Sequence, residues 1–345
     1  MPDLRWPFAA QNWNDRAVDV LCLGHALVDR LAYATLDEVV IARMEPGAMT
    51  LVDGDRAAEI ERAFSAWREI AGGSAANTAV GVASLGGSPG FAGAVGDDRA
   101  GSWYASDLER LGVRAVVATV SSGQPTGVCH VLVAPGGERS MATSLGAAAE
   151  LAVETVEHAG VDRARVLYVE GYLLDAPAAT AALNRALELA HRSSVLVALT
   201  LSDPFVVDRH RTRIADLVFE GAVDVLLGNA DEALGLTGAG SLAGAVAALR
   251  REGSVAVVTL GASGSLLVTP SGEATIGADE VAQVEDTTGA GDLFAAGFLY
   301  GLTHGASPEA ALRLGSFAAA EIIGHLGARP AIRLADAMPE GLVPG

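Results

Sequence analysis

The residues with the clearest chemical potential lie at positions 288–292, which read Thr-Gly-Ala-Gly-Asp. A valine-rich segment precedes them, and small and apolar residues at helical spacing follow, so the pattern predicts a tight loop that enters a helix. Unpaired backbone amides and the helix dipole both favour an anion at a helix N-terminus. We therefore expect this loop to bind a phosphate group.

Asp292 is the unusual member of this group, because a carboxylate repels phosphate. It has a function there if it accepts a proton from a nucleophile that attacks the bound phosphate. The structural alternative is that Asp292 only caps the helix, as many single acidic residues at that position do. The Gly-Ala-Gly-Asp combination favours the catalytic interpretation.

All 23 basic residues are arginines, and the chain has no lysine. This composition excludes a P-loop, a protein-kinase mechanism and Schiff-base chemistry with pyridoxal phosphate. Backbone amides, arginines or Mg²⁺ must therefore supply the positive charge that a phosphate needs. The formal net charge of −19 disfavours nucleic acid as a partner.

The 345 residues, of which 50% are hydrophobic, are enough for a large core. The two cysteines, Cys22 and Cys129, have no metal-ligand spacing and fit a reducing compartment. No apolar run reaches the length of a signal peptide or a membrane span. We expect a soluble, cytoplasmic protein without a membrane partner.

Strand-like and helix-like segments alternate from about residue 18 to residue 330, which predicts an α/β fold with a mostly parallel sheet. Residues 18–25 read as a buried first strand, with Asp29 just past its C-terminal end, and residues 55–70 read as an amphipathic helix. We expect a tail at 1–17 and one domain at 18–335. A small β lid is expected from about 31–52 and 113–122.

A second glycine turn precedes another helix of small residues at positions 71–80. Gly72 and Gly73 would let the backbone approach a ligand closely, and Asn77 would project toward it from the first helical turn. The alternative is that the small residues serve close helix packing alone.

These features together resemble the ribokinase (PfkB) family of small-molecule kinases. The resemblance extends over nearly the whole chain and rests on four motifs: the paired glycines with Asn77, Asn229 with Glu232, Gly261 with Gly264, and the Asp-Thr-Thr-Gly-Ala-Gly-Asp run at 286–292. It implies a ribokinase-like three-layer sandwich with a β lid. It also implies ATP and Mg²⁺ as cosubstrate and cofactor, with transfer of the γ-phosphoryl group to a hydroxyl.

The resemblance also implies a role for each matching residue. Asp292 would be the catalytic base, and Arg139 with the amides of Gly289, Ala290 and Gly291 would meet the phosphate charge. Asn229 and Glu232 would organise Mg²⁺ through water, and a monovalent cation such as K⁺ is a further candidate. The expected acceptor residues are His25, Asp29, Gly72, Gly73, Asn77, Tyr172 and Phe205, and the expected nucleotide residues are Asn229, Thr259, Gly261, Gly264 and Thr287.

Structural alternatives remain for several of these residues. Arg139 could be a solvated hairpin arginine, and Glu232 an ordinary acidic residue of a first helical turn. Tyr172 and Phe205 could be plain core, and so could His25, which stands where the family usually has asparagine.

Within the family, the segments at 72–74, 138–140, 201–205 and 228–232 are most similar to those of adenosine kinases. The leading hypothesis is therefore phosphorylation of the 5′-hydroxyl of adenosine, as in purine salvage, by a monomer or homodimer. The runner-up is a sugar kinase acting on ribose, fructose or a related sugar. A nucleotide sensor without catalysis is disfavoured because Asp292, Asn229 and Glu232 are all present. A dinucleotide oxidoreductase is disfavoured because no Gly-x-Gly-x-x-Gly follows the first strand.

Overall fold

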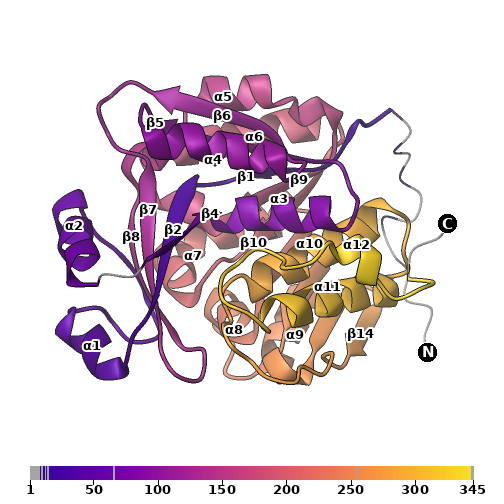
Figure 1. The fold of residues 1–345 in the computed structure, drawn as a ribbon. Helices are drawn as coiled ribbons and strands as arrows, with labels where there is room; N and C mark the ends of the chain where they lie inside the picture. Colours follow the sequence, from indigo (N-terminus) through magenta and orange to yellow (C-terminus); the bar gives the residue numbers. More distant parts are fainter. Residues whose placement is uncertain are drawn as a thin grey trace.

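A computed structural model describes residues 15–64, 67–253 and 255–342, together with Phe8, Gln11 and Trp13. The expected tail at 1–17 lies mostly outside the described residues. Figure 1 shows a large sheet between helices, with a smaller sheet beside it.

The larger sheet has nine strands in the order β14-β13-β12-β11-β10-β9-β1-β5-β6. The strands from β6 to β12 run parallel, whereas β13 and β14 are antiparallel additions at one edge. Their bounds are β1 (Val18–Leu23), β5 (Pro89–Gly96), β6 (Arg114–Val120), β9 (Ala164–Glu170), β10 (Leu196–Thr200), β11 (Val225–Asn229), β12 (Val255–Thr259), β13 (Ser265–Thr269) and β14 (Gly272–Ile276).

Helices cover both faces of this sheet. One face packs against α3 (Ser74–Ser84), α4 (Arg99–Arg110), α10 (Ala290–Thr303), α11 (Pro308–Ile322) and α12 (Leu334–Ala337). The other packs against α5 (Val153–Ala159), α6 (Pro177–Arg192), α7 (Pro204–Phe219), α8 (Ala230–Thr237) and α9 (Leu242–Arg251). Because successive strand residues point to opposite faces, Cys22 of β1 joins the first core while Leu21 and Leu23 join the second. The predicted three-layer α/β sandwich is confirmed.

The smaller sheet forms a lid at the left of Figure 1. Its strand order is β3 (Met49–Leu51), β8 (Arg139–Ser144), β7 (Gly127–Val133), β2 (Leu27–Tyr33) and β4 (Arg68–Gly72). The helices α1 (Leu36–Ile41) and α2 (Gly54–Ala63) contribute Val39 and Ile60 to the apolar cluster on one face of this sheet. The opposite face carries Leu31, Cys129, Val131 and Val133.

Three local expectations were wrong. Residues 113–122 are not part of the lid, because β6 pairs in parallel with β5 at the edge of the larger sheet. An edge strand shows the same half-buried pattern as a lid strand, so the sequence pattern did not separate them. The helix expected at 55–70 ends at Ala63, and Asp29 lies inside β2 rather than just past the first strand.

The lid touches the segment that leads into the 288–292 loop. The Oγ1 of Thr287 donates to the carbonyl of Gly137, 3.3 Å away in the turn between β7 and β8. At the end of β2, the hydroxyl of Tyr33 donates to a carboxylate oxygen of Glu285 at 2.6 Å. The lid is therefore hydrogen-bonded to the residues that come just before the predicted phosphate-binding loop.

Within the described ranges, no single helix has both the length and the apolar composition to cross a membrane, although the bent pair α8 and α9 together reaches both limits.

Close packing of α10 against α11 depends on Gly297. A Cβ added there would lie 2.2 Å from the carbonyl oxygen of Leu314, which is backbone and has little freedom to move. We predict that Gly297→Ala lowers the free energy of unfolding by about 1–3 kcal/mol, the usual range for overpacking. Gly240→Ala is the matched control, because nothing lies within 4 Å of its Cβ position. Equal thermal melting of the two variants would contradict this account of the helix contact.

Candidate active site

A cavity of about 980 Å³ lies between the lid and the C-terminal ends of the parallel strands. This is the edge at which open α/β sheets bind ligands. Of the predicted site residues, all except Gly72 line it: His25, Asp29, Gly73, Asn77, Arg139, Tyr172, Phe205, Asn229, Glu232, Thr259, Gly261, Gly264, Thr287, Gly289, Ala290, Gly291 and Asp292. The sequence motifs therefore converge on one cavity.

Asp292 lies in the first turn of α10 and contacts the first turn of α3. Its Oδ1 accepts a hydrogen bond from the hydroxyl of Ser74 at 2.7 Å, and its Oδ2 accepts one from Nδ2 of Asn77 at 2.9 Å. Burial raises the pKa of Asp292, and these two donors oppose that shift. The carboxylate is thus fixed in orientation by two hydrogen bonds and partly removed from water. Neither property is needed for a side chain that only caps a helix.

Residues 286–291 form a turn that we call the anion turn, and the side chain of its first residue, Asp286, stabilises it. This fully buried carboxylate accepts hydrogen bonds from the backbone amide of Thr288 and from that of Gly327, both at 2.8 Å. Gly289 has φ of 78°, which favours glycine, and a Cβ there would lie 2.7 Å from the Cβ of Ala328. Gly289, Ala290 and Gly291 border the cavity, and the amide of Ala290 donates to the carbonyl of Thr287 at 3.3 Å.

The acceptor turn, residues 71–76, joins β4 to α3. Gly72 lines no part of the cavity because it packs behind Asp29, where a Cβ would lie 2.0 Å from the Oδ2 of Asp29. Asp29 is 7% exposed, and burial raises its pKa to about 7, with Arg329 opposing the rise. The Oδ1 of Asn77 is buried and has no hydrogen-bond partner in this structure. Both side chains carry oxygens that can accept hydrogen bonds from hydroxyl groups, and their role as acceptor ligands stays a prediction.

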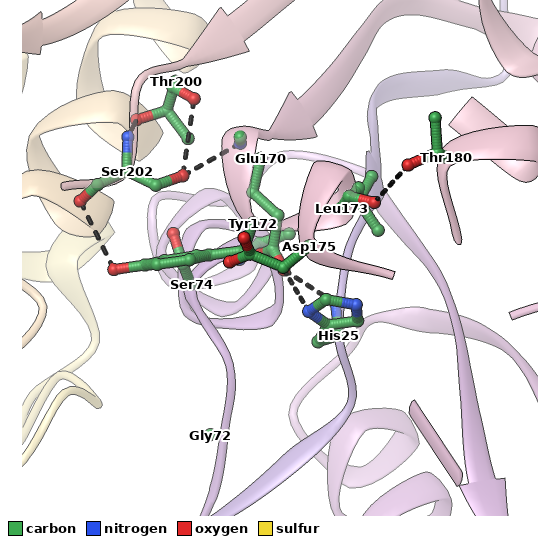
Figure 2. A network of polar contacts seen from close by, with 12 residues as sticks. His25, Gly72, Ser74, Glu170, Tyr172, Leu173, Asp175, Thr180, Thr200 and Ser202 are labelled. Atoms are coloured by element: carbon green, nitrogen blue, oxygen red, sulfur yellow. Dashed lines mark hydrogen bonds and ion pairs between the residues drawn. The ribbon is translucent and has the colours of Figure 1, made fainter. Parts of the chain in front are cut away.

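Glu170 ends β9 and joins the loop after β1 to the acceptor turn, as Figure 2 shows. Its Oε1 accepts from the backbone amide of His25 at 2.8 Å, and its Oε2 accepts from that of Ala75 at 2.9 Å. Burial raises the pKa of Glu170 to about 7, while the two amides oppose the rise. Glu170 thereby connects two segments that line the cavity.

His25 is 2% exposed, and burial lowers its pKa to about 4, so the imidazole is neutral at physiological pH. Its Nε2 has no hydrogen-bond partner. The residue borders the cavity, which supports a contact with the acceptor more than the alternative of a core histidine.

On the nucleotide side, Asn229 and Glu232 form a capping box at the start of α8. Glu232 Oε2 accepts from the backbone amide of Asn229 at 2.9 Å, and Oε1 accepts from its Nδ2 at 2.7 Å. Thr259 ends β12, and Gly261 and Gly264 bracket the tight turn that follows it. The position of these residues along the cavity edge agrees with the predicted nucleotide site.

The same capping box suits a hydrated magnesium ion better than a directly bound one. Both carboxylate oxygens of Glu232 already accept hydrogen bonds, and burial raises its pKa to about 7. A nearby cation would favour its ionised form. Throughout the part of the chain that the structure describes, no group of three or more His, Cys, Asp or Glu side chains is arranged to hold a metal. These residues fit contact with Mg²⁺ through water.

Three further predicted residues differ in their surroundings. Arg139 begins β8, is half-buried beside the cavity, and its charge opposes the rise in the pKa of Asp292, so its role at the phosphate stays a prediction. Tyr172 lies within hydrogen-bonding reach of the carbonyl of Ser202, at 3.5 Å (Figure 2). Phe205 is 49% exposed at the start of α7 and is therefore not core.

Two residues beside the site were not predicted from the sequence. Glu170 carried a weak signal, since it is a single acidic residue at the C-terminal end of an apolar strand. Arg329 carried none, because it lies in an irregular segment after α11 and its contacts are with backbone carbonyls of residues 71 and 76.

Comparison with known proteins identifies the family of this chain. The pfkB family carbohydrate kinase model matches residues 39–334. The structure is similar to the adenosine kinase of Sinorhizobium meliloti (41% identity, TM-score 0.90, 93% of this chain and 98% of that one). It is also similar to a probable sugar kinase of Rhizobium etli (37% identity, TM-score 0.91, 95% and 100%). A 5-dehydro-2-deoxygluconokinase of Listeria monocytogenes is 26% identical over 94% of this chain and 95% of its own length. The chain belongs to the pfkB family of carbohydrate kinases.

Glu170 makes a pH-dependent contribution to stability that can be measured. Its carboxyl group has a pKa of about 7 in the folded protein, above the ordinary value of 4.5. The stability associated with the protonated group is therefore present below the ordinary value and is lost as pH rises through about 7. We predict that Glu170→Gln, which cannot ionise, becomes more stable relative to the wild type between about pH 5.5 and about pH 8. Glu188→Gln, at an exposed carboxylate on α6, is the control and should show no such trend in melting temperature. A constant difference between Glu170→Gln and the wild type would contradict the assignment.

Proposed function

We propose that this pfkB-family kinase transfers the γ-phosphoryl group of ATP to the 5′-hydroxyl of adenosine. The observation that carries the proposal is the position of the Asp292 carboxylate. It is bonded to Ser74 and Asn77 beside the acceptor turn, and it shares the first turn of α10 with Ala290 and Gly291 of the anion turn. A proton acceptor at this junction serves an alcohol that attacks a bound phosphate.

In the proposed step, the acceptor oxygen forms a bond to the γ-phosphorus while the bond from that phosphorus to the β–γ bridging oxygen breaks. The hydroxyl proton moves to a carboxylate oxygen of Asp292, and ADP leaves. Asp29 and Asn77 would orient the acceptor, and the amides of the anion turn with Arg139 would face the transferred group. Mg²⁺, when bound, would neutralise phosphate charge beside Asn229 and Glu232. A monovalent cation such as K⁺ remains a prediction.

Adenosine is favoured by the surfaces at the acceptor end of the cavity. Tyr172 and Phe205 line it together with apolar lid residues such as Met49 and Leu145, which is a setting that a purine base can occupy. The 41% identity to an adenosine kinase supports the same acceptor. The similarity extends over 93% of this chain and 98% of that enzyme.

A sugar is the second candidate, and a specific observation favours it. The curated relatives are 5-dehydro-2-deoxygluconokinases, and one similar structure is described as a probable sugar kinase. Asp29 and Asn77 bind hydroxyl groups, which a free sugar also carries. The two candidates share the transfer chemistry and differ in what fills the apolar end of the cavity.

The role of Asp292 predicts a large loss of turnover when the carboxylate is replaced. Asp292→Asn keeps the shape of the side chain, so ATP binding should stay nearly intact while kcat falls by about 10²–10⁴-fold, the scale of a lost general base. Asp208→Asn, at an exposed position of α7, is the control and should keep wild-type turnover. Near-normal kcat in Asp292→Asn would show that the proton has another acceptor.

The acceptor can be identified by ATP consumption over a panel of adenosine, other nucleosides, ribose, fructose and 5-dehydro-2-deoxygluconate. We expect adenosine to give the highest kcat/KM, because only a nucleoside uses both the hydroxyl ligands and the apolar end of the cavity. A higher kcat/KM for any of the sugars would replace adenosine with that sugar and leave the proposed role of Asp292 intact.

A further inference from the structure

The segment at residues 327–329, which follows α11, touches both halves of the transfer site. Its first residue donates the amide hydrogen bond to Asp286 that supports the anion turn, at 2.8 Å. Ala328 packs against Gly289 so closely that a Cβ on the glycine would lie 2.7 Å away. Arg329 then turns toward the acceptor side.

The guanidinium group of Arg329 binds backbone carbonyls on both sides of the glycine pair. Its Nε donates to the carbonyl oxygen of Ala71 at 2.8 Å, and Nη2 donates to the same oxygen. Its Nη1 donates to the carbonyl of Ala76 at 2.8 Å. A planar group with several fixed donors holds two carbonyls in a defined relative position, which the single ammonium of a lysine does less well. The conformation of the acceptor turn is therefore set by a side chain from the C-terminal segment.

The charge of Arg329 also acts on the site. None of the ion pairs among the described residues includes it, so its positive charge is not cancelled by a directly bound carboxylate. The carboxylate of Asp29 lies against Gly72, the neighbour of Ala71, whose carbonyl oxygen Arg329 binds. The other charged groups that act on Asp29 are Arg139, which favours its ionised form, and Asp292 and Asp286, which disfavour it.

We propose that Arg329 is a positioning residue that couples the anion turn to the acceptor turn and provides the main positive charge facing Asp29. An acceptor hydroxyl donates its hydrogen to Asp29, so the side chain has to be ionised to bind it well. Burial raises the pKa of Asp29, and Arg329 is the larger of the two positive influences that lower it. The kinetic part of this inference rests on the proposed function, because it takes Asp29 as a ligand of the acceptor.

The first test is independent of any acceptor. The carboxyl carbon of Asp29 is followed by NMR across pH in the full chain, with Asp29→Asn to assign its signal. We expect Arg329→Gln to raise the pKa of Asp29 by about one pH unit, the lower end of the effect of a nearby opposite charge. Arg329→Lys keeps the charge and should leave the titration close to that of the wild type. Arg333→Gln is the control, since Arg333 is 64% exposed and pairs with Asp336.

The second test measures the KM for adenosine at two pH values. If the pKa of Asp29 rises from about 7 to about 8, its ionised fraction at pH 7 falls roughly fivefold. The ratio of the KM of Arg329→Gln to that of the wild type should therefore be roughly fivefold larger at about pH 7 than at about pH 9. Loss of the two carbonyl contacts alone would raise KM by the same factor at both pH values.

The two tests separate failure of this inference from failure of the proposed function. An unchanged titration of Asp29 in Arg329→Gln would overturn the inference, whatever the acceptor is. If Arg329→Gln does not fold, Arg329→Lys takes its place, and we expect it to fold and to show the wild-type pKa of Asp29. A pKa of Asp29 that differs from the wild type by one pH unit or more in Arg329→Lys would refute the inference. A wild-type enzyme that ignores adenosine but shows the expected titration would refute the nucleoside assignment and keep the role of Arg329.

Discussion

Two helix N-termini have to meet for this site to exist, and the carboxylate of Asp292 joins them. Its two oxygens are bonded to side chains in the first turn of α3, while its own backbone belongs to the first turn of α10. The hydroxyl of Thr78 adds a bond to the carbonyl of Asp292 at 3.2 Å. The absence of a side chain at Gly297 lets α10 lie against α11 at the distance that this arrangement needs. The position of α10 is thus fixed both by its packing against α11 and by the hydrogen bonds of Asp292 to α3.

Several acidic groups in this cavity share an unusual environment. Burial raises the pKa of Asp29, Glu170 and Glu232 to about 7 in each case. In a chain without lysine, the groups that keep these carboxyls ionised are backbone amides and a few arginines. Each of the three also connects to a different segment: the lid, the acceptor turn and the start of α8. The protonation states of these three carboxyl groups are consequently linked to the positions of the segments that line the cavity.

The sequence predicted the parts of the site that depend on local chemistry. The glycine turns, Asn77, Asn229 and Asp292 could be identified because a loop before a helix restricts which residue types fit. The assignment of strands to the two sheets could not be predicted as well, since β6 and the lid strands have similar local patterns and differ only in their partners. Arg329 was missed for a related reason. Its importance comes from contacts with residues about 250 positions away, and no local pattern records such a contact.

The contact between Thr287 and Gly137 has a consequence for the order of events in a catalytic cycle. The turn of the lid is bonded to Thr287, which lies two residues before Gly289 in the anion turn. A movement of the lid that carried Gly137 away from Thr287 would break this bond. Because such coupling is reciprocal, a ligand that orders the anion turn also favours the closed lid, to the same extent that closure favours the ligand. The hydrogen bond between Thr287 and Gly137 would therefore link ligand binding at the anion turn to the position of the lid.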